Sequence, residues 1–235
     1  MRLDYMQKRV STDEVIFHSL DQILEFRIGY VRDFSIIAGA LQDNEVIQHC
    51  DAQIRQSTTL TDLGLEARQY FLVTVHRAEN VDVEARLIGL TTALDRLQKE
   101  YGVPVIISTH PRTRARMQTY GIGIDNDQVR FLPPFGFFDF ITLERHAQCV
   151  HSDSGTVQEE CAIFGVPNVT IRDVTERPET IECGSNMLSG ADVETVLQCV
   201  RTVLELRGKW SASREYLVEN VSDIVIKIIL GYLHQ

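Results

Sequence analysis

Residues 148–167 read QCVHSDSGTVQEECAIFGVP, so that a short apolar run, a polar corner and a helix-forming segment follow one another. The run at 148–152 predicts a buried strand, and residues 156–164 predict a helix that ends at Gly-Val-Pro. A strand that passes through a short corner into a helix is the repeating unit of α/β folds. This stretch therefore favours an α/β fold for the chain.

The same alternation continues along the chain from about residue 70. Strands that alternate with helices through short polar corners are typical of a doubly wound parallel sheet, so we expect a Rossmann-like α/β unit. The predicted strands are 71–75, 103–109, 129–132, 148–152 and 168–172. One predicted helix has Asp82 as its N-cap, and three more cover 112–117, 137–145 and 156–164. A further helix is predicted from about Val193, and a last one from Ser213 to Tyr232.

The first 65 residues give a less regular pattern. Thr12–Phe26 and Asn44–Ile54 are predicted helices, and the segment between them fits neither a strand nor a helix pattern. No complete set of two strands and a crossover helix is visible here. We therefore expect one Rossmann-like domain in this chain, because these residues are too few for a second.

Composition and charge restrict the partners. The chain has 235 residues, of which 44% are apolar and 24% charged, as in an ordinary globular protein. The formal net charge of −10 argues against nucleic acid or an anionic membrane as the main partner. A small anionic ligand remains compatible with this charge, because a helix N-terminus and one or two arginines can bind phosphate locally.

The cysteines and the apolar runs indicate a cytoplasmic protein. The five cysteines include no CxxC pair, which argues against a disulfide framework and a structural zinc site. The N-terminal residues lack the apolar core of a signal peptide. No apolar run approaches the roughly 18 residues that a membrane span needs.

Polar and ionisable residues gather directly after the predicted strands, at 76–80, 110–114, 153–156 and 173–178. In doubly wound sheets ligands bind beyond the carboxyl ends of the strands, so these corners are the candidate site. The sequence has no GxGxxG loop, Walker loop, GxSxG elbow or HExxH motif, and we predict no metal.

Each corner residue has a functional and a structural interpretation. His76 can contact a phosphate or move a proton, or it can be an exposed histidine with a local ion pair. Arg177 can face an anion, or it can pair on the surface with Glu176 or Glu179. His110 can contribute to the site or can cap the helix that Pro111 starts.

The corner SDSGT (152–156) also has two interpretations. The amides of Gly155 and Thr156, with the hydroxyls of Ser154 and Thr156, can hold a diphosphate at the positive end of the helix dipole. Alternatively, Ser154 or Asp153 acts only as an N-cap. Glu160, further along the same helix, can accept hydrogen bonds from both ribose hydroxyls or can lie on a solvated helix face.

Together the motifs HRAEN, STHPRT, SDSGT-xxEE and TERPE, in this order, resemble the non-hydrolysing UDP-N-acetylglucosamine 2-epimerases. The resemblance covers about residues 68–235. It implies the glycosyltransferase-B arrangement of two Rossmann-like domains, with the active site between them and UDP held by the C-terminal domain. It also implies that this chain represents one of those two halves.

The resemblance implies a role for each matching residue. His76 resembles the family's active-site histidine near the diphosphate. Ser154, Gly155 and Thr156 resemble its phosphate-binding turn, and Glu160 resembles its ribose ligand. Arg177 resembles the arginine that faces the substrate. Phe140 stands where the family has a contact to the uracil side.

Two departures from the family pattern affect what the resemblance implies. Thr156 replaces the second of two glycines, and SDSGT with HRAENVD and STHPRTR is more similar to the branch that makes UDP-N-acetyl-L-fucosamine. Only 75 residues precede His76, whereas the family's catalytic carboxylates lie on a full N-terminal domain. We therefore expect 1–67 to be a mostly helical remnant or hinge, and 68–235 to be the UDP-binding domain with a C-terminal helix.

The family reaction eliminates UDP across C1–C2 of the sugar and adds it back with C2 inverted, which implies no redox cofactor. The expected function is that of a nucleotide-sugar 2-epimerase, present as its UDP-binding half and inactive alone. The alternatives are a non-catalytic UDP-sugar-binding or interaction module and a glycosyltransferase of the same architecture. The expected partners are a UDP-sugar and a second copy of the chain in a homodimer, without nucleic acid or membrane.

Overall fold

The computed structural model describes residues 44–218 and residues 221, 223 and 227. Its centre is a six-stranded parallel sheet with the order β3-β2-β1-β4-β5-β6. This order is the Rossmann order, which confirms the predicted fold class. The strands are β1 (Phe71–Thr74), β2 (Val105–Ser108), β3 (Val129–Leu132), β4 (Cys149–Ser152), β5 (Asn168–Thr170) and β6 (Asn186–Leu188).

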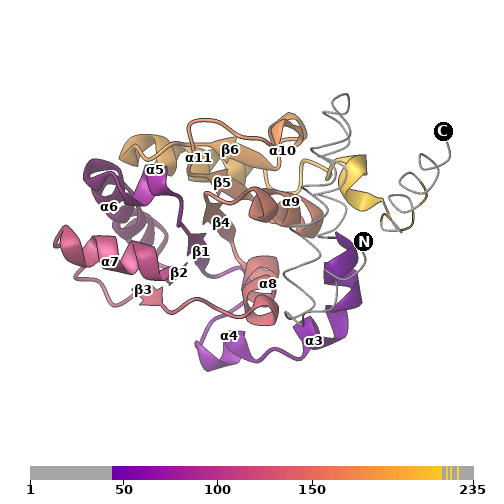
Figure 1. Cartoon of the computed structure of the whole chain (residues 1–235), viewed down its shortest axis with the longest axis horizontal. Helices are drawn as coiled ribbons and strands as arrows, with labels where there is room; N and C mark the ends of the chain where they lie inside the picture. Colours follow the sequence, from indigo (N-terminus) through magenta and orange to yellow (C-terminus); the bar gives the residue numbers. More distant parts are fainter. Residues whose placement is uncertain (1–43, 219–220, 222, 224–226, 228–235) are drawn as a thin grey trace, which may run out of the picture.

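Helices cover both faces of this sheet (Figure 1). One face carries α6 and α11, and the other carries α8 and α9. The helices of the domain are α5 (Ala78–Val81), α6 (Glu84–Tyr101), α7 (Pro111–Thr119), α8 (Phe137–His146), α9 (Gly155–Phe164), α10 (Pro178–Glu182) and α11 (Val193–Glu205). Every strand and helix predicted between residues 71 and 205 is present.

Side chains along each strand alternate between the two faces. In β1, Phe71 and Val73 pack on the α6 and α11 side, while Leu72 packs on the α8 and α9 side. In β2, Ile107 and Ile106 divide in the same way. Because both faces are covered, the strands read as continuous apolar runs rather than as alternating ones.

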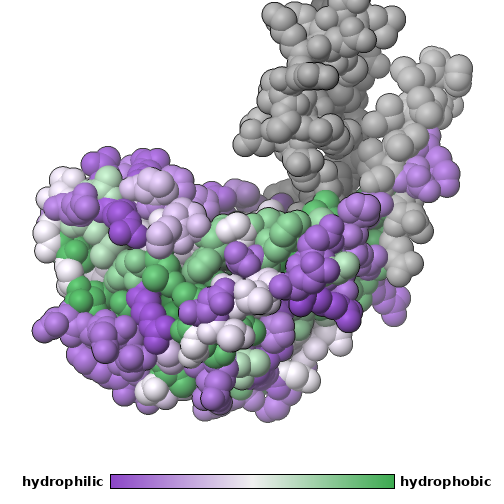
Figure 2. All heavy atoms as spheres, turned by 90° about the horizontal axis from the view of Figure 1, so that it is seen from below, coloured by the Kyte–Doolittle hydropathy of each residue, from purple (hydrophilic) through white to green (hydrophobic). Residues whose placement is uncertain are grey.

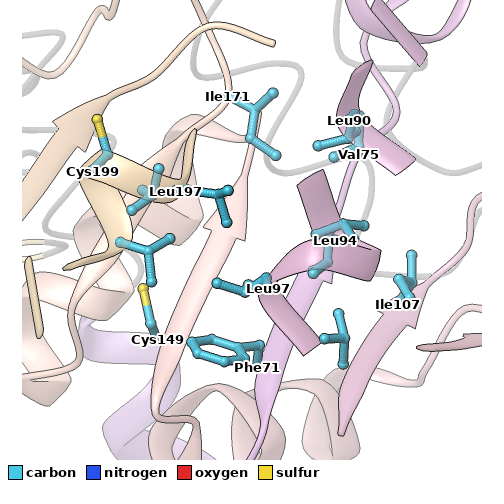
Figure 3. Packing of buried hydrophobic residues seen from close by; sticks show 14 of the residues in the cluster. Phe71, Val75, Leu90, Leu94, Leu97, Ile107, Cys149, Ile171, Leu197 and Cys199 are labelled. Carbon is cyan, nitrogen blue, oxygen red and sulfur yellow. The ribbon is translucent and has the colours of Figure 1, made fainter. Parts of the chain in front are cut away.

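The larger core cluster joins the sheet to α6 and α11 (Figure 3). Leu90, Leu94 and Leu97 of α6 point into it, as their spacing predicts. Gly89 brings α6 close to the loop before α11, since an added Cβ would stand 2.8 Å from the carbonyl oxygen of Ala191. These contacts fix α6 behind the first corner of the candidate site.

Several boundaries differ from the predictions. The N-cap of α6 is Val83, whose side chain makes no cap hydrogen bond. Asp82 does not act as the predicted cap, because its carboxylate pairs with Arg112 and Arg116 of α7. The sequence analysis also missed α10 and β6, which have 5 and 3 residues and are too short for a periodic pattern.

The predicted helix from Ser213 to Tyr232 does not begin at Ser213. Residues Arg214–Leu217 form a 3-10 turn, and Val218 is extended. Residues 221, 223 and 227 are helical, and the rest of this predicted helix lies outside the described residues.

Helices also precede the sheet. Residues 44–49 are helical, followed by α3 (Asp51–Arg55) and α4 (Thr59–Asp62). Ile47 and Ile54 pack on Ile141 of α8, so this segment extends the domain on the α8 side. The predicted helix Thr12–Phe26 lies outside the described residues.

The face of the molecule seen from below shows hydrophobic residues between hydrophilic ones (Figure 2). Two large exposed side chains, Phe137 and Phe138, start α8 and stack edge to face.

Within the described part of the chain, no helix is both long enough and apolar enough to span a bilayer.

One buried side chain makes the core sensitive to acid. His151 of β4 is fully buried and packs its ring 5.7 Å from that of Phe71. Neither ring nitrogen has a hydrogen-bond partner among the described residues. Desolvation by burial therefore lowers the pKa of His151 from 6.5 to about 4.

We predict that replacing His151 by leucine removes part of the acid sensitivity. The unfolded chain binds a proton on this ring near pH 6.5, whereas the folded chain resists protonation until about pH 4. Stability is therefore lost as the pH falls through this window, by up to about 3 kcal/mol. Urea unfolding at several pH values should show a smaller loss in His151→Leu, and parallel pH profiles would contradict the prediction.

Candidate functional site

The site lies where the strand order changes direction, between β1 and β4. The sequence runs outward in one direction through β2 and β3 and in the other through β5 and β6, so the loops after β1 and β4 separate here. Ligands of doubly wound sheets bind in the crevice at such a switch point. The segments that meet here are HRAEN (76–80) after β1, whose last three residues begin α5, and DSGT (153–156) after β4, whose last two residues begin α9.

A single buried carboxylate, that of Asp153, joins these two loops. Its oxygens accept hydrogen bonds from the backbone N–H groups of His76, at 3.1 and 3.2 Å, and of Arg77, at 2.9 Å. Asn80 Nδ2 donates a third at 3.1 Å, and the His76 Nδ1 atom lies 3.2 Å from Oδ1. Asp153 therefore faces the first loop and not the helix that follows it.

Asn80 extends this connection to the loop after β5. Its Nδ2 also donates to the carbonyl oxygen of Ile171, at 2.8 Å, and its Oδ1 accepts from the guanidinium of Arg86. Arg86 in turn pairs with Asp173 at 3.0 Å. The loops after β1, β4 and β5 are thus held in one hydrogen-bonded unit.

A nearly buried cation lies at the same edge. The side chain of Arg172 is 5% exposed, and its guanidinium lies 3.4 Å from the carboxylates of both Glu79 and Glu176. Glu79 belongs to the first corner and Glu176 to the corner after β5. Arg172 therefore joins two of the loops that the sequence singles out through its two ion pairs.

The N-terminus of α9 has no side-chain cap. Ser154 occupies the N-cap position without a cap hydrogen bond, and its hydroxyl instead lies 2.9 Å from that of Thr156. An added Cβ at Gly155 would meet no atom of the described residues within 4 Å. The capping interpretation of Ser154 and Asp153 is therefore wrong, and the space in front of the first turn is open.

The polar residues Gln158 and Glu159 hold the TERPE loop against α9. Gln158 Oε1 accepts from Thr175 Oγ1 at 2.7 Å, and Glu159 pairs with the Nε atom of Arg177. Glu159 is fully buried, and the Arg177 side chain is 21% exposed. Burial lowers the pKa of Arg177, but the charge and the hydrogen bond of Glu159 raise it, and the net result is a pKa above the ordinary value. The predicted surface pair of Arg177 with the Glu176 or Glu179 side chain is wrong.

Glu160 is also buried, with 7% of its surface exposed. The interpretation of Glu160 as part of a solvated helix face is therefore wrong. The three consecutive polar residues of α9 thus have different surroundings, and Gln158 and Glu159 anchor the next loop.

His110 is the N-cap of α7. Its Nδ1 accepts from the backbone N–H of Arg112 at 3.2 Å, which confirms the structural interpretation of this histidine. Its ring centre lies 6.2 Å from that of His76, so the second corner borders the first. Arg112 and Arg116 both bind Asp82.

Phe140 lies in the first half of α8, partly buried against the cluster that contains Leu143 and Tyr70. No ring contact joins it to the other predicted residues in the described part of the chain. The structure thus brings His76 beside the loop of Ser154, Gly155 and Thr156, and Arg177 onto α9, while Phe140 packs against the cluster that also contains Val157 of α9.

Among the described residues, no three His, Cys, Asp or Glu side chains cluster in a way that could hold a metal ion. The five cysteines are free thiols. Burial raises the pKa of the thiols of Cys149, Cys161 and Cys199 above the ordinary value, which keeps them in the unreactive protonated form.

The sequence analysis missed the positioning residues Asp153, Asn80 and Glu159. Asp153 was interpreted only as a possible N-cap of the helix that follows it. Asn80 was included in the motif HRAEN, but no role was predicted for it. A polar residue directly after a predicted buried strand is the signal that could have identified Asp153. Its actual partner is 77 residues away in the sequence and could not be read from local pattern.

We predict that the Arg177–Glu159 pair contributes strongly to stability. Arg177→Met leaves a fully buried carboxylate without this ion pair, and should lower the free energy of unfolding by about 3 kcal/mol. The matched control is Arg201→Met, which breaks the more exposed pair with Glu100 and should cost less than about 1 kcal/mol. Equal losses in urea unfolding would contradict the prediction.

Comparison with known proteins shows where this chain has relatives. The family described as UDP-N-acetylglucosamine 2-epimerase matches residues 36–230. The UDP-N-acetylglucosamine 2-epimerase of Methanococcus maripaludis is 37% identical over 166 residues, which are 69% of this chain and 45% of that protein. The UDP-2,3-diacetamido-2,3-dideoxy-D-glucuronate 2-epimerase of Pseudomonas aeruginosa is 38% identical over 143 residues, which are 60% of this chain and 39% of that protein.

The fold has a close counterpart among solved structures. The UDP-GlcNAc 2-epimerase of Methanocaldococcus jannaschii, solved in complex with UDP-GlcNAc and UDP, superposes with a TM-score of 0.73 and 30% identity. The superposition covers 80% of this chain and 53% of that one. The chain thus spans about half the length of the proteins it matches.

Proposed function

The chain belongs to the UDP-N-acetylglucosamine 2-epimerase family, and we propose that it carries the UDP-binding corner of a nucleotide-sugar 2-epimerase. Its UDP-sugar would lie across the switch point, with the diphosphate at the N-terminus of α9. Because the matched relatives are about twice as long, the bases that act on the sugar are proposed to belong to the part of the family that this chain does not match.

The open N-terminus of α9 is the observation that carries this proposal. Asp153, the acidic residue directly before the N-cap in the sequence, is engaged with the loop after β1, so it does not cap the first turn. Gly155 leaves room for a ligand to approach the backbone. The uncapped N–H groups and the helix dipole then favour a diphosphate, which the hydroxyls of Ser154 and Thr156 can also contact.

The other predicted residues are assigned around this diphosphate. Glu160 would accept hydrogen bonds from the ribose hydroxyls, since a buried carboxylate is stabilised by donors. Arg177, whose Nε is held by Glu159 and whose Nη1 donates to the carbonyl oxygen of Glu176 at 3.2 Å, would face the substrate with Nη2. His76 would lie near the diphosphate, and Phe140 would contact the uracil side.

The proposed reaction follows from the chemistry of the family. The proton at C2 of the sugar leaves with UDP across C1–C2, which gives a 2-acetamidoglycal. UDP adds back to C1 while C2 receives a proton on the other face. The C2 hydrogen moves as a proton, so no electrons pass to a cofactor, and donors at the diphosphate stabilise the negative charge of the departing UDP.

The proposed UDP-binding corner does not determine which sugar the protein accepts. The two relatives described above are named for different sugars, UDP-N-acetylglucosamine and a diacetamido-glucuronate. Both share UDP, which supports a corner that recognises the nucleotide and leaves sugar selection to other residues. This family membership favours an epimerase over a glycosyltransferase of the same architecture. A module that binds the UDP-sugar without catalysis is the second candidate, because the chain matches only part of each relative.

We predict that Gly155→Ala folds normally but weakens UDP binding at least about tenfold. The methyl group meets no atom within 4 Å in the part of the chain that the structure describes, yet it would occupy space through which the phosphate would approach the backbone. Gly123→Ala is the control, because its methyl also meets no atom of the described residues within 4 Å. Its loop lies before β3, at the amino ends of the strands, opposite the candidate site. Calorimetry that gives equal UDP affinities for the two variants would refute the phosphate site.

We predict that Glu160→Gln reduces the preference for UDP over 2′-deoxy-UDP. The amide can accept fewer hydrogen bonds than the carboxylate, so the contribution of the 2′-hydroxyl should fall by about 1 kcal/mol or more. The control Glu66→Gln changes an exposed glutamate before β1 and should leave the ratio of dissociation constants unchanged. A ratio that does not move in Glu160→Gln would remove this residue from the ribose site.

A further inference from the structure

Two histidines at the switch point use the same ring nitrogen in opposite ways. The Nδ1 atom of His76 lies 3.2 Å from Oδ1 of Asp153, and the Nδ1 atom of His110 lies 3.2 Å from the backbone nitrogen of Arg112. The carboxylate is an acceptor here, whereas a backbone N–H can only donate. The hydrogen bond to Arg112 requires the neutral ring of His110 to carry its proton on Nε2. The carboxylate 3.2 Å from Nδ1 of His76 would repel a lone pair on that nitrogen, which favours a neutral ring with its proton on Nδ1.

We propose that Asp153 is a positioning residue that fixes His76 as the Nδ1–H tautomer and leaves Nε2 as the nitrogen that meets the ligand. The tautomer is inferred from the 3.2 Å approach of Nδ1 to the carboxylate of Asp153, while the identity of the ligand as UDP rests on the proposed function.

The carboxylate is well suited to this role because it cannot turn. Asp153 is fully buried, and its Oδ2 accepts from Arg77 N and Asn80 Nδ2, at 2.9 and 3.1 Å. These bonds hold Oδ1 toward the His76 ring. The His76 side chain is 45% exposed, and no described residue bonds to its Nε2. The ring is thus held on one side and accessible on the other.

The same ring orientation serves both protonation states. In the neutral state, the lone pair on Nε2 can accept a hydrogen bond or a proton. In the protonated state, Nε2–H can donate to a phosphate oxygen while Nδ1–H remains on Asp153. Asp153 thereby lets His76 change its role toward an anion without losing its position.

The first test uses the unmutated chain with 15N-labelled histidine and records long-range proton–nitrogen NMR correlations. His76 should show the Nδ1–H pattern and His110 the Nε2–H pattern. His146 is an internal reference for the first pattern, because its Nδ1 lies 2.8 Å from the carbonyl oxygen of Thr142 and must donate to it. An Nε2–H pattern at His76 would overturn the proposal without any need for a variant.

The second test adds UDP to the same sample. The Nε2 signal of His76 should shift more than its Nδ1 signal, and Gly155→Ala should lose this response. UDP binding by calorimetry without a change at Nε2 would overturn the assignment of that nitrogen to the ligand. A complete absence of UDP binding would overturn the proposed function and this assignment together, while the tautomer would be decided by the first test.

The third test is Asp153→Asn, which keeps the size of the side chain. His76 should lose its Nδ1–H preference, and the dissociation constant for UDP should rise about five- to tenfold, as expected for one lost hydrogen bond. Asp62→Asn, which changes an exposed aspartate on α4, should alter neither quantity. A folded Asp153→Asn variant with an unchanged tautomer and affinity would refute the positioning role. If the variant does not fold, the unmutated chain still decides the tautomer.

Discussion

The geometry of the candidate site depends on one buried carboxylate. A charged group without solvent is strongly destabilising unless donors surround it, and Asp153 obtains its donors from the loop after β1. The same bonds draw that loop across the switch point of the sheet and leave the adjacent helix α9 uncapped. The positions of His76 and Asn80 and the open first turn of α9 therefore have a common cause.

The polar face of α9 has a second structural role. Gln158 Oε1 accepts from Thr175 Oγ1 and also from Asn186 Nδ2, at 3.1 Å, and Asn186 Oδ1 accepts from Thr170 Oγ1, at 2.9 Å. Gln158, Asn186 and Thr170 are buried between the helix and the outer strands, Thr175 is partly buried, and these side chains satisfy one another. A buried network of this kind specifies one arrangement, because any other would leave polar groups unpaired. It fixes the TERPE loop relative to the first turn of α9.

The sequence predicted the larger architecture well for physical reasons. Both faces of the sheet are covered, so its central strands are apolar runs that stand out between helices, and the leucines of α6 repeat with helical spacing. Strand β6 has only 3 residues, two of them partly buried, and gives no such signal. The corners that hold the site were predicted because polar residues follow strands. The interaction partners of these polar residues were not predicted. Asp82, for example, was predicted to cap a helix, but it pairs with Arg112 and Arg116 instead. Each such choice depends on residues that are distant in sequence.

The contact across the switch point also has a consequence for folding kinetics. Asp153 and His76 are 77 residues apart, and they meet only after β4 has paired with β1 beyond the unit formed by β1, β2 and β3. Closing so long a segment is entropically slow, so we expect this corner to form late in assembly. A ligand of this corner therefore has no site on earlier intermediates. It would lengthen the lifetime of the native state by slowing unfolding, and it would leave the rate of folding unchanged.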